Sequence, residues 1–170
     1  AISIVGIDSV PFSYYRAKLE QERIVEQGDV PWSMVRATQF PQLLDAVFSA
    51  TARIGVVPTA TFPMRPVDPR FVATVLADAA EHGPAGRLPS VAGPEVTTLA
   101  ELARTWKQIE HRHALAVHLP MKPSARRALV AGALIPGDDA QTGGAAFGEW
   151  LRERSSEMSD RLPGTAEAIG

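Results

Sequence analysis

Ala1-Ile-Ser-Ile-Val-Gly-Ile7, followed after a short loop by Tyr14-Tyr-Arg-Ala-Lys18, is the stretch of sequence that decides the fold. Residues 2–7 form a continuous apolar run, which is typical of a strand that other elements cover on both faces. Helical spacing predicts a helix over 13–27, and Gly28 follows it at a position where helices commonly end. A buried strand that leads into a helix predicts the repeating unit of an α/β fold with a parallel sheet.

The same alternation continues along the chain. Short apolar runs predict further strands at 32–36, 54–57, 64–67, 88–92 and 114–119. Helical periodicity predicts helices at 41–53, at 68–82, after the capping-box sequence Thr97–Glu101, at 124–131, and around Phe147 and Trp150. We therefore predict one α/β domain over 1–153. After Arg154 the residues turn polar and aperiodic, which predicts a disordered tail over 154–170.

Composition and charge exclude several classes of function. The 170 residues include 45% hydrophobic and 21% charged residues, and the formal net charge is -2, so no basic face for nucleic acid is expected. Without cysteine, neither a disulfide framework nor a thiolate metal site can form. No apolar run approaches the roughly 20 residues of a membrane span. We expect a soluble, cytoplasmic protein with a small-molecule substrate, no nucleic-acid or membrane partner, and an undetermined oligomeric state.

The helix predicted over 13–27 carries the first candidate site. Its expected core-facing residues are Tyr15, Leu19, Ile24 and Val25, and Glu22 is expected to point outward. Tyr14 and Lys18 lie four residues apart and so share a helix face. A free phenol titrates at about 10, and a neighbouring ammonium favours its phenolate form, as proton transfer near neutral pH requires. The alternative is a tyrosine that packs and a lysine that is solvated.

Three segments in this order resemble a known family: Ile2-Ser-Ile-Val-Gly-Ile-Asp8, Tyr14-Tyr-Arg-Ala-Lys-Leu-Glu-Gln-Glu22 and Trp32-Ser-Met-Val-Arg-Ala-Thr-Gln-Phe40. The sequence looks like an atypical short-chain dehydrogenase/reductase of the NmrA-like NAD(P)-binding group. Pro66-Val-Asp68 and Gly93-Pro-Glu-Val-Thr-Thr-Leu99 resemble the same group, and the similarity spans about 2–151. The resemblance implies a partial Rossmann-like parallel sheet that begins at about the fifth strand of that fold.

The resemblance also implies roles for individual residues. Tyr14 would donate a proton, and Lys18 would hold the nicotinamide ribose hydroxyls. Ser3, with Ser9 as the second choice, would orient the substrate carbonyl. These are the expected catalytic residues.

After the sixth strand of the resembled fold, backbone groups meet the nicotinamide carboxamide. This implies that Ala37, Thr38, Gln39 and Phe40 bind the cofactor together with Lys18, with Phe40 as a wall of the pocket. An equally weighted alternative is that Arg36 pairs with a carboxylate and Phe40 fills core. Asp68 is interpreted as a helix cap rather than a ligand.

The cofactor implied is NADH or NADPH, but its usual anchor is missing from these residues. No G-x-x-G-x-x-G follows a strand anywhere in the sequence, although the resembled proteins bind the pyrophosphate with such a loop at their first strand. The chain therefore looks like the second half of a larger fold.

His111 and His113 are the remaining pair with metal-binding character, because residues two apart share a strand face. No third ligand stands at a suitable spacing, which favours solvated histidines.

Three functions follow from the sequence. The first is an NAD(P)H-dependent oxidoreductase acting on a small carbonyl or quinone-like acceptor. The second is a non-catalytic NAD(P)-sensing or regulatory protein that uses the same cleft. The third is a truncated product with no activity of its own.

Overall fold

The computed structural model describes residues 1–160, with side chains through 157. Six helices and nine strands follow one another in this part of the chain. The helices are α1 (Ser13–Gln27), α2 (Pro41–Ala52), α3 (Pro69–His82), α4 (Leu99–Ile109), α5 (Pro123–Val130) and α6 (Phe147–Asp160). The strands are β1 (Ile2–Ile4), β2 (Ser33–Ala37), β3 (Val56–Thr59), β4 (Pro63–Met64), β5 (Gly86–Arg87), β6 (Val91–Ala92), β7 (Thr97–Thr98), β8 (Leu115–His118) and β9 (Gln141–Thr142).

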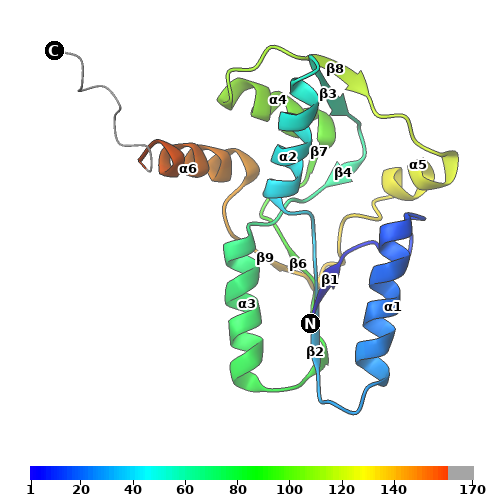
Figure 1. The fold of residues 1–170 in the computed structure, drawn as a ribbon. Coiled ribbons are helices and arrows are strands. Elements are labelled where there is room, and N and C mark those ends of the chain that lie inside the picture. The colour runs from blue at the N-terminus through cyan, green and yellow to red at the C-terminus, as the bar shows by residue number, and fades with distance from the viewer. Residues whose placement is uncertain (161–170) are drawn as a thin grey trace.

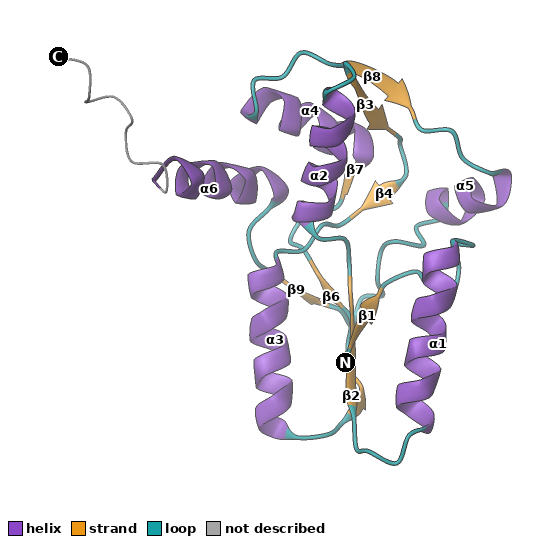
Figure 2. Ribbon diagram, in the orientation of Figure 1, coloured by secondary structure: helices purple, strands orange, loops and turns teal. Residues whose placement is uncertain are grey.

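The main sheet has five strands, all paired in parallel. Its order is β1-β2-β6-β9, with β5 also paired to β2. Helices α1 and α3 stand on opposite sides of this sheet, as Figures 1 and 2 show. A parallel sheet between two layers of helices is the Rossmann-like arrangement. The predicted α/β fold class is confirmed.

A second group of elements lies beyond the carboxyl end of β2 (Figure 1). It contains α2, α4, the parallel pair β3–β8 and the antiparallel pair β4–β7. Its core is built around Phe48 and Trp106, which are 0% and 1% exposed, and Trp150 and Leu151 of α6 pack into the same cluster. The core between the sheet and α3 is separate and made mostly of valines, Val35, Val67, Val72, Val75 and Val91.

Helix starts follow local chemistry. The carboxylate of Asp68 accepts a hydrogen bond from the Arg70 backbone N–H at 2.9 Å, so the predicted cap of α3 is confirmed. Thr98 and Glu101 form the predicted capping box at the start of α4.

The first strand is shorter than predicted. It ends at Ile4, and residues 5–9 form turns. Gly6 adopts φ +85°, and a Cβ on this residue would lie 2.2 Å from the Ala133 carbonyl oxygen. The chain therefore leaves the sheet where glycine allows a left-handed backbone and a close approach.

Two other predictions about the sheet are corrected. The strand predicted at 114–119 is β8, which lies outside the main sheet, pairs with β3 and is exposed along its whole length. The main sheet instead takes β9 from a segment that carries no apolar run. Pairing with β6 provides the hydrogen bonds that make this segment a strand, with Gln141 N–H donating to the Ser90 carbonyl at 2.8 Å.

The end of the domain also differs from the prediction. Helix α6 runs on to Asp160, past the predicted boundary at 153, so the first part of the predicted tail is helical. Arg154 joins this helix to the rest of the fold, because its guanidinium pairs with Asp45 of α2 and Glu110 after α4. The rest of the predicted tail, residues 161–170, lies outside the described residues.

Candidate cofactor-binding edge

Lys18 reaches from α1 to the first strand of the sheet. Its Nζ donates to the Ile2 carbonyl oxygen at 3.1 Å and to the Gln21 side-chain oxygen at 2.7 Å. Lys18, Ser3 and Glu22 line one small hollow between β1 and α1, together with Met34 of β2, and this hollow is too narrow to admit a water molecule. The structure thus brings together two of the three predicted catalytic residues. An ammonium carries three N–H groups, and two of them are used here.

Ser3 lies inside this hollow rather than on an open surface. It is 4% exposed and sits opposite Arg36 in the register of β1 and β2. Its hydroxyl lies close enough to the Glu22 carboxylate to help lower the pKa of Glu22, but it is not within standard hydrogen-bond geometry of any described side chain. A buried hydroxyl without a good partner is uncommon in folded proteins.

Glu22 is the residue at this site whose predicted position was wrong. It was predicted to face outward, yet it is 2% exposed, whereas Ile24, predicted to face the core, is 65% exposed. The Arg36 guanidinium donates to both Glu22 oxygens at 2.9 and 2.7 Å, and Arg87 donates to it at 2.9 Å. Burial by itself raises the pKa of Glu22, but the hydrogen bonds from Arg36 and Arg87, with the Ser3 hydroxyl close by, outweigh it and lower the pKa to about 2.

Arg36 therefore pairs with a carboxylate, which was one of the two alternatives for this residue. Besides Glu22 it pairs with Asp8 in the loop after β1. These contacts raise the pKa of the Arg36 guanidinium. The network ties α1, the loop after β1, and strands β2 and β5 together beneath the hollow. An arginine at 36 and a glutamate at 22 were visible in the sequence, but nothing local indicated that they meet.

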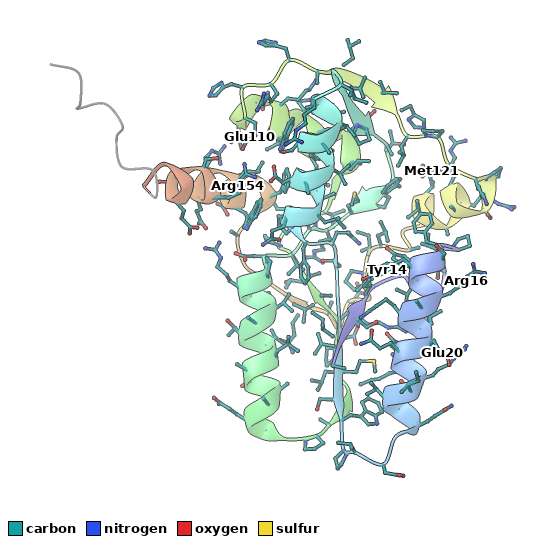
Figure 3. All side chains as sticks on the ribbon, viewed as in Figure 1. Tyr14, Arg16, Glu20, Glu110, Met121 and Arg154 are labelled. Carbon is teal, nitrogen blue, oxygen red and sulfur yellow. The ribbon has the colours of Figure 1, made fainter. Side chains whose placement is uncertain are left out.

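Tyr14 lies apart from this hollow. It starts the first turn of α1, is 62% exposed, and its ring meets that of Tyr15 at 6.2 Å between centroids. Figure 3 shows Tyr14 at the end of α1 that faces Met121 before α5. Tyr15 is the tyrosine that joins the core, and burial raises the pKa of its phenol. Tyr14 and Lys18 share a helix, but no contact joins them.

Most backbone groups of residues 37–40 are already engaged. The Ala37 carbonyl accepts from Val5 N–H at 3.0 Å, and Thr38 N–H donates to the Val91 carbonyl at 3.0 Å. The Gln39 carbonyl accepts from Val67 N–H at 2.9 Å. By contrast, both polar atoms of the Gln39 side-chain amide are buried without a partner in the described part of the chain. Phe40 precedes α2 and packs against the valine core.

His111 and His113 were the pair with metal-binding character in the sequence, where solvated histidines were favoured. His111 lies just after α4 and not on a strand. Across the described residues no group of three or more histidine, aspartate or glutamate side chains is arranged to hold a metal ion. Within the same residues no helix has the length and apolar character needed to cross a membrane.

Comparison with known proteins places the fold in a class. The parallel sheet with flanking helices is shared with NAD(P)-binding reductases and epimerases of the Rossmann type. An NADPH-dependent quinone oxidoreductase from Escherichia coli superposes with a TM-score of 0.68 and 14% identity, over 91% of this chain and 66% of that one.

Two other solved structures are similar. A nucleoside-diphosphate-sugar epimerase from Staphylococcus aureus gives a TM-score of 0.61 at 10% identity, over 89% of this chain and 63% of that one. The Citrobacter sp. triphenylmethane reductase complexed with NADP(H) gives 0.53 at 14% identity, over 81% and 57%. No family model matches the chain, and no curated protein sequence does. The chain spans less than two thirds of the length of these neighbours, and identities this low establish the shared fold alone.

Proposed function

We propose that this chain is part of an NAD(P)H-dependent oxidoreductase of the atypical short-chain dehydrogenase type, acting on a small carbonyl or quinone-like acceptor. The observation that carries the proposal is that Lys18 of α1 and Ser3 of β1 lie together beside the edge strand of a parallel sheet. Among proteins of similar fold are an NADPH-dependent quinone oxidoreductase and a triphenylmethane reductase.

The residues present fit part of a nicotinamide cofactor. Lys18 retains a third N–H beyond its two protein partners, which could be donated to a ribose hydroxyl. Gln39 carries an unpaired amide donor and acceptor at the carboxyl end of β2, where ligands of open parallel sheets bind. Ala37, Thr38 and Phe40 would flank it. Bound there, the cofactor would supply a hydride; the G-x-x-G-x-x-G loop that binds the pyrophosphate in the resembled proteins does not occur in this sequence.

The protein's own residues would then handle the proton. Hydride addition to a carbonyl leaves negative charge on its oxygen, and a phenol within reach can neutralise it by donating a proton from Oη. Tyr14 would fill this role in contact with solvent, from which its proton is replaced. Lys18 would position the cofactor, and Ser3 would orient the acceptor oxygen.

One observation favours a second function, a non-catalytic NAD(P)-binding sensor or regulatory protein. The Tyr14 ring is mostly exposed and lies outside the hollow that holds Ser3 and Lys18. A sensor needs the cofactor contacts of Lys18 and Gln39 but no proton donor aligned with them. The two functions therefore share a binding site and differ in the role of Tyr14.

Calorimetric titration with NADPH and NADH, followed by turnover with a series of quinones, tests both functions. For an oxidoreductase we expect Tyr14→Phe to lower kcat while the cofactor Kd stays unchanged, and Lys18→Met to weaken cofactor binding. For a sensor we expect binding without turnover in every variant, and weaker binding for Lys18→Met. Lys122→Met, which removes an exposed lysine before α5, is the matched control. Absence of any NADPH or NADH binding by the wild type would contradict both functions.

A further inference from the structure

A stripe of polar side chains runs along the outer face of α4, far from β1. Its members are spaced three, four and seven residues apart, so they share one side of the helix: Arg104, Lys107, Gln108 and, just past the helix end, His111. The opposite side is buried in the core through Leu102, Ala103 and Trp106. In Figure 1, α4 and β8 lie at the end of the molecule opposite α1 and the start of β2.

Two adjoining open hollows follow this stripe. One, of about 420 Å³, is lined by Arg104, Lys107, Gln108, His111, Arg112 and His113. The other, of about 390 Å³, is lined by Gly55, Lys107, Arg112, His113, Ala114 and Leu115. Lys107, Arg112 and His113 belong to both hollows. No aspartate or glutamate lines either one, so an anion seated across them meets donors and no carboxylate.

The two acidic residues of this region are bound elsewhere. Glu101 accepts from Thr97 and Thr98 at the other end of α4. Glu110 pairs with Arg154 of α6, and both residues are labelled in Figure 3. Among the described residues, Arg104 and Arg112 form no close ion pair. Glu101 attracts Arg104 only at longer range, and this attraction is the smallest of the effects acting on the pKa of Glu101. Lys107 donates a hydrogen bond to the Ala114 carbonyl at 3.2 Å.

His111 adds an independent observation. Its φ of +48° makes it the only non-glycine residue with positive φ among residues 1–160. It stands just after the last residue of the helix cap, where the Arg112 N–H donates back to the Lys107 carbonyl at 3.0 Å. Glycine is the residue that adopts this conformation without strain. A strained histidine at this position brings an imidazole to the rim of the hollow, and such strain is a feature of functional positions.

We propose that these paired hollows bind a small molecule that carries a diphosphate group. Guanidinium groups bind phosphate oxygens in a bidentate manner, and the shared residues between the hollows let two linked phosphates bridge them. The negative end of the helix dipole attracts cations, which explains the positions of Lys107 and Arg112 near the C-terminus of α4. It does not explain Arg104, which lies a turn earlier, or the strained His111. This site goes beyond the proposed function, since it shares no residue with the hollow at β1.

Calorimetry at low ionic strength with pyrophosphate, ADP and adenosine tests the site. We expect pyrophosphate and ADP to bind and adenosine not to bind. If ADP binds with much higher affinity than pyrophosphate, the ligand of the site is a nucleotide. If the two affinities are equal, the ligand is a free diphosphate. The double variant Arg104→Gln/Arg112→Gln should lose at least about tenfold in affinity. Arg126→Gln/Arg127→Gln on α5, which removes the same charge from an exposed pair, should stay within about twofold of wild type.

Replacing His111 by glycine separates a ligand-binding role from a structural one. Glycine relieves the positive-φ strain, so we expect a higher Tm together with weaker diphosphate binding. Equal losses in the two double arginine variants would mean that binding reflects overall charge, and the proposal would be overturned. It would also be overturned if wild type bound neither diphosphate, or if His111→Gly raised Tm and left affinity unchanged.

Discussion

Replacing Glu22 by glutamine removes the charge at the centre of the ion-pair network beneath the candidate site. The pKa of Glu22 is lowered from 4.5 to about 2, because the hydrogen bonds from Arg36 and Arg87, with the Ser3 hydroxyl close by, outweigh the opposing effect of burial. A difference of this size between the folded and unfolded states corresponds to roughly 3 kcal/mol of stability. Arg87 is 47% exposed, and water there weakens its pairing. We therefore expect Glu22→Gln to lower the free energy of unfolding by about 2–3 kcal/mol at pH 7.

The pH dependence provides a second test of the same reasoning. The folded-state pKa lies below the unfolded one, so the contribution of the carboxylate is complete above about pH 4.5 and is lost as the pH falls through about 2. Urea unfolding of wild type and Glu22→Gln at several pH values measures the difference between them. That difference should shrink steadily between pH 4.5 and 2.

The matched control is Glu20→Gln, which breaks an exposed pair with Arg23 on the same helix and should change stability by less than about 0.5 kcal/mol. Two results would refute the reasoning: a Glu22→Gln variant as stable as Glu20→Gln at pH 7, or a stability difference that does not change between pH 7 and pH 2.

Three further predictions concern packing and helix ends. Gly93→Ala should destabilise the fold by more than about 2 kcal/mol in urea unfolding, because a Cβ would lie 1.7 Å from the Pro66 carbonyl oxygen; a smaller loss would mean that this loop can move aside. Thr98→Ala should cost about 1 kcal/mol by removing the cap of α4, and circular dichroism melting should show a lower Tm, whereas an unchanged Tm would contradict the capping role. Leu151→Ala should cost about 2–4 kcal/mol, since this side chain is 0% exposed; a near-neutral effect in chemical unfolding would show that α6 does not complete the core.

Much of the fold could be predicted from the sequence, because the signals are local. Apolar periodicity identified the helices, and the capping sequences at Asp68 and Thr98 marked two of their starts correctly. These interactions join residues within about one helical turn, so they can be predicted from residues that are close together in the sequence.

The candidate site could be predicted only in part. Lys18 and Ser3 were named from a motif and its preceding strand, and the structure places both in one hollow. The position of Tyr14 outside that hollow could not be predicted from helical spacing alone. Two residues on the same helix face can contact different parts of the fold. The roles of these residues stay predictions until cofactor binding and turnover are measured.

The sequence by itself determined the alternation of strands and helices and the starts of two helices. The tertiary structure alone decided that Glu22 is buried, that β8 leaves the main sheet and that β9 joins it. Glu22 meets Arg36 across 14 residues of chain and Arg87 across 65. Such partners lower the cost of burying a charge, but they are brought together only by folding. Burial of charge and strand pairing depend on distant segments, and local patterns carry no information about them.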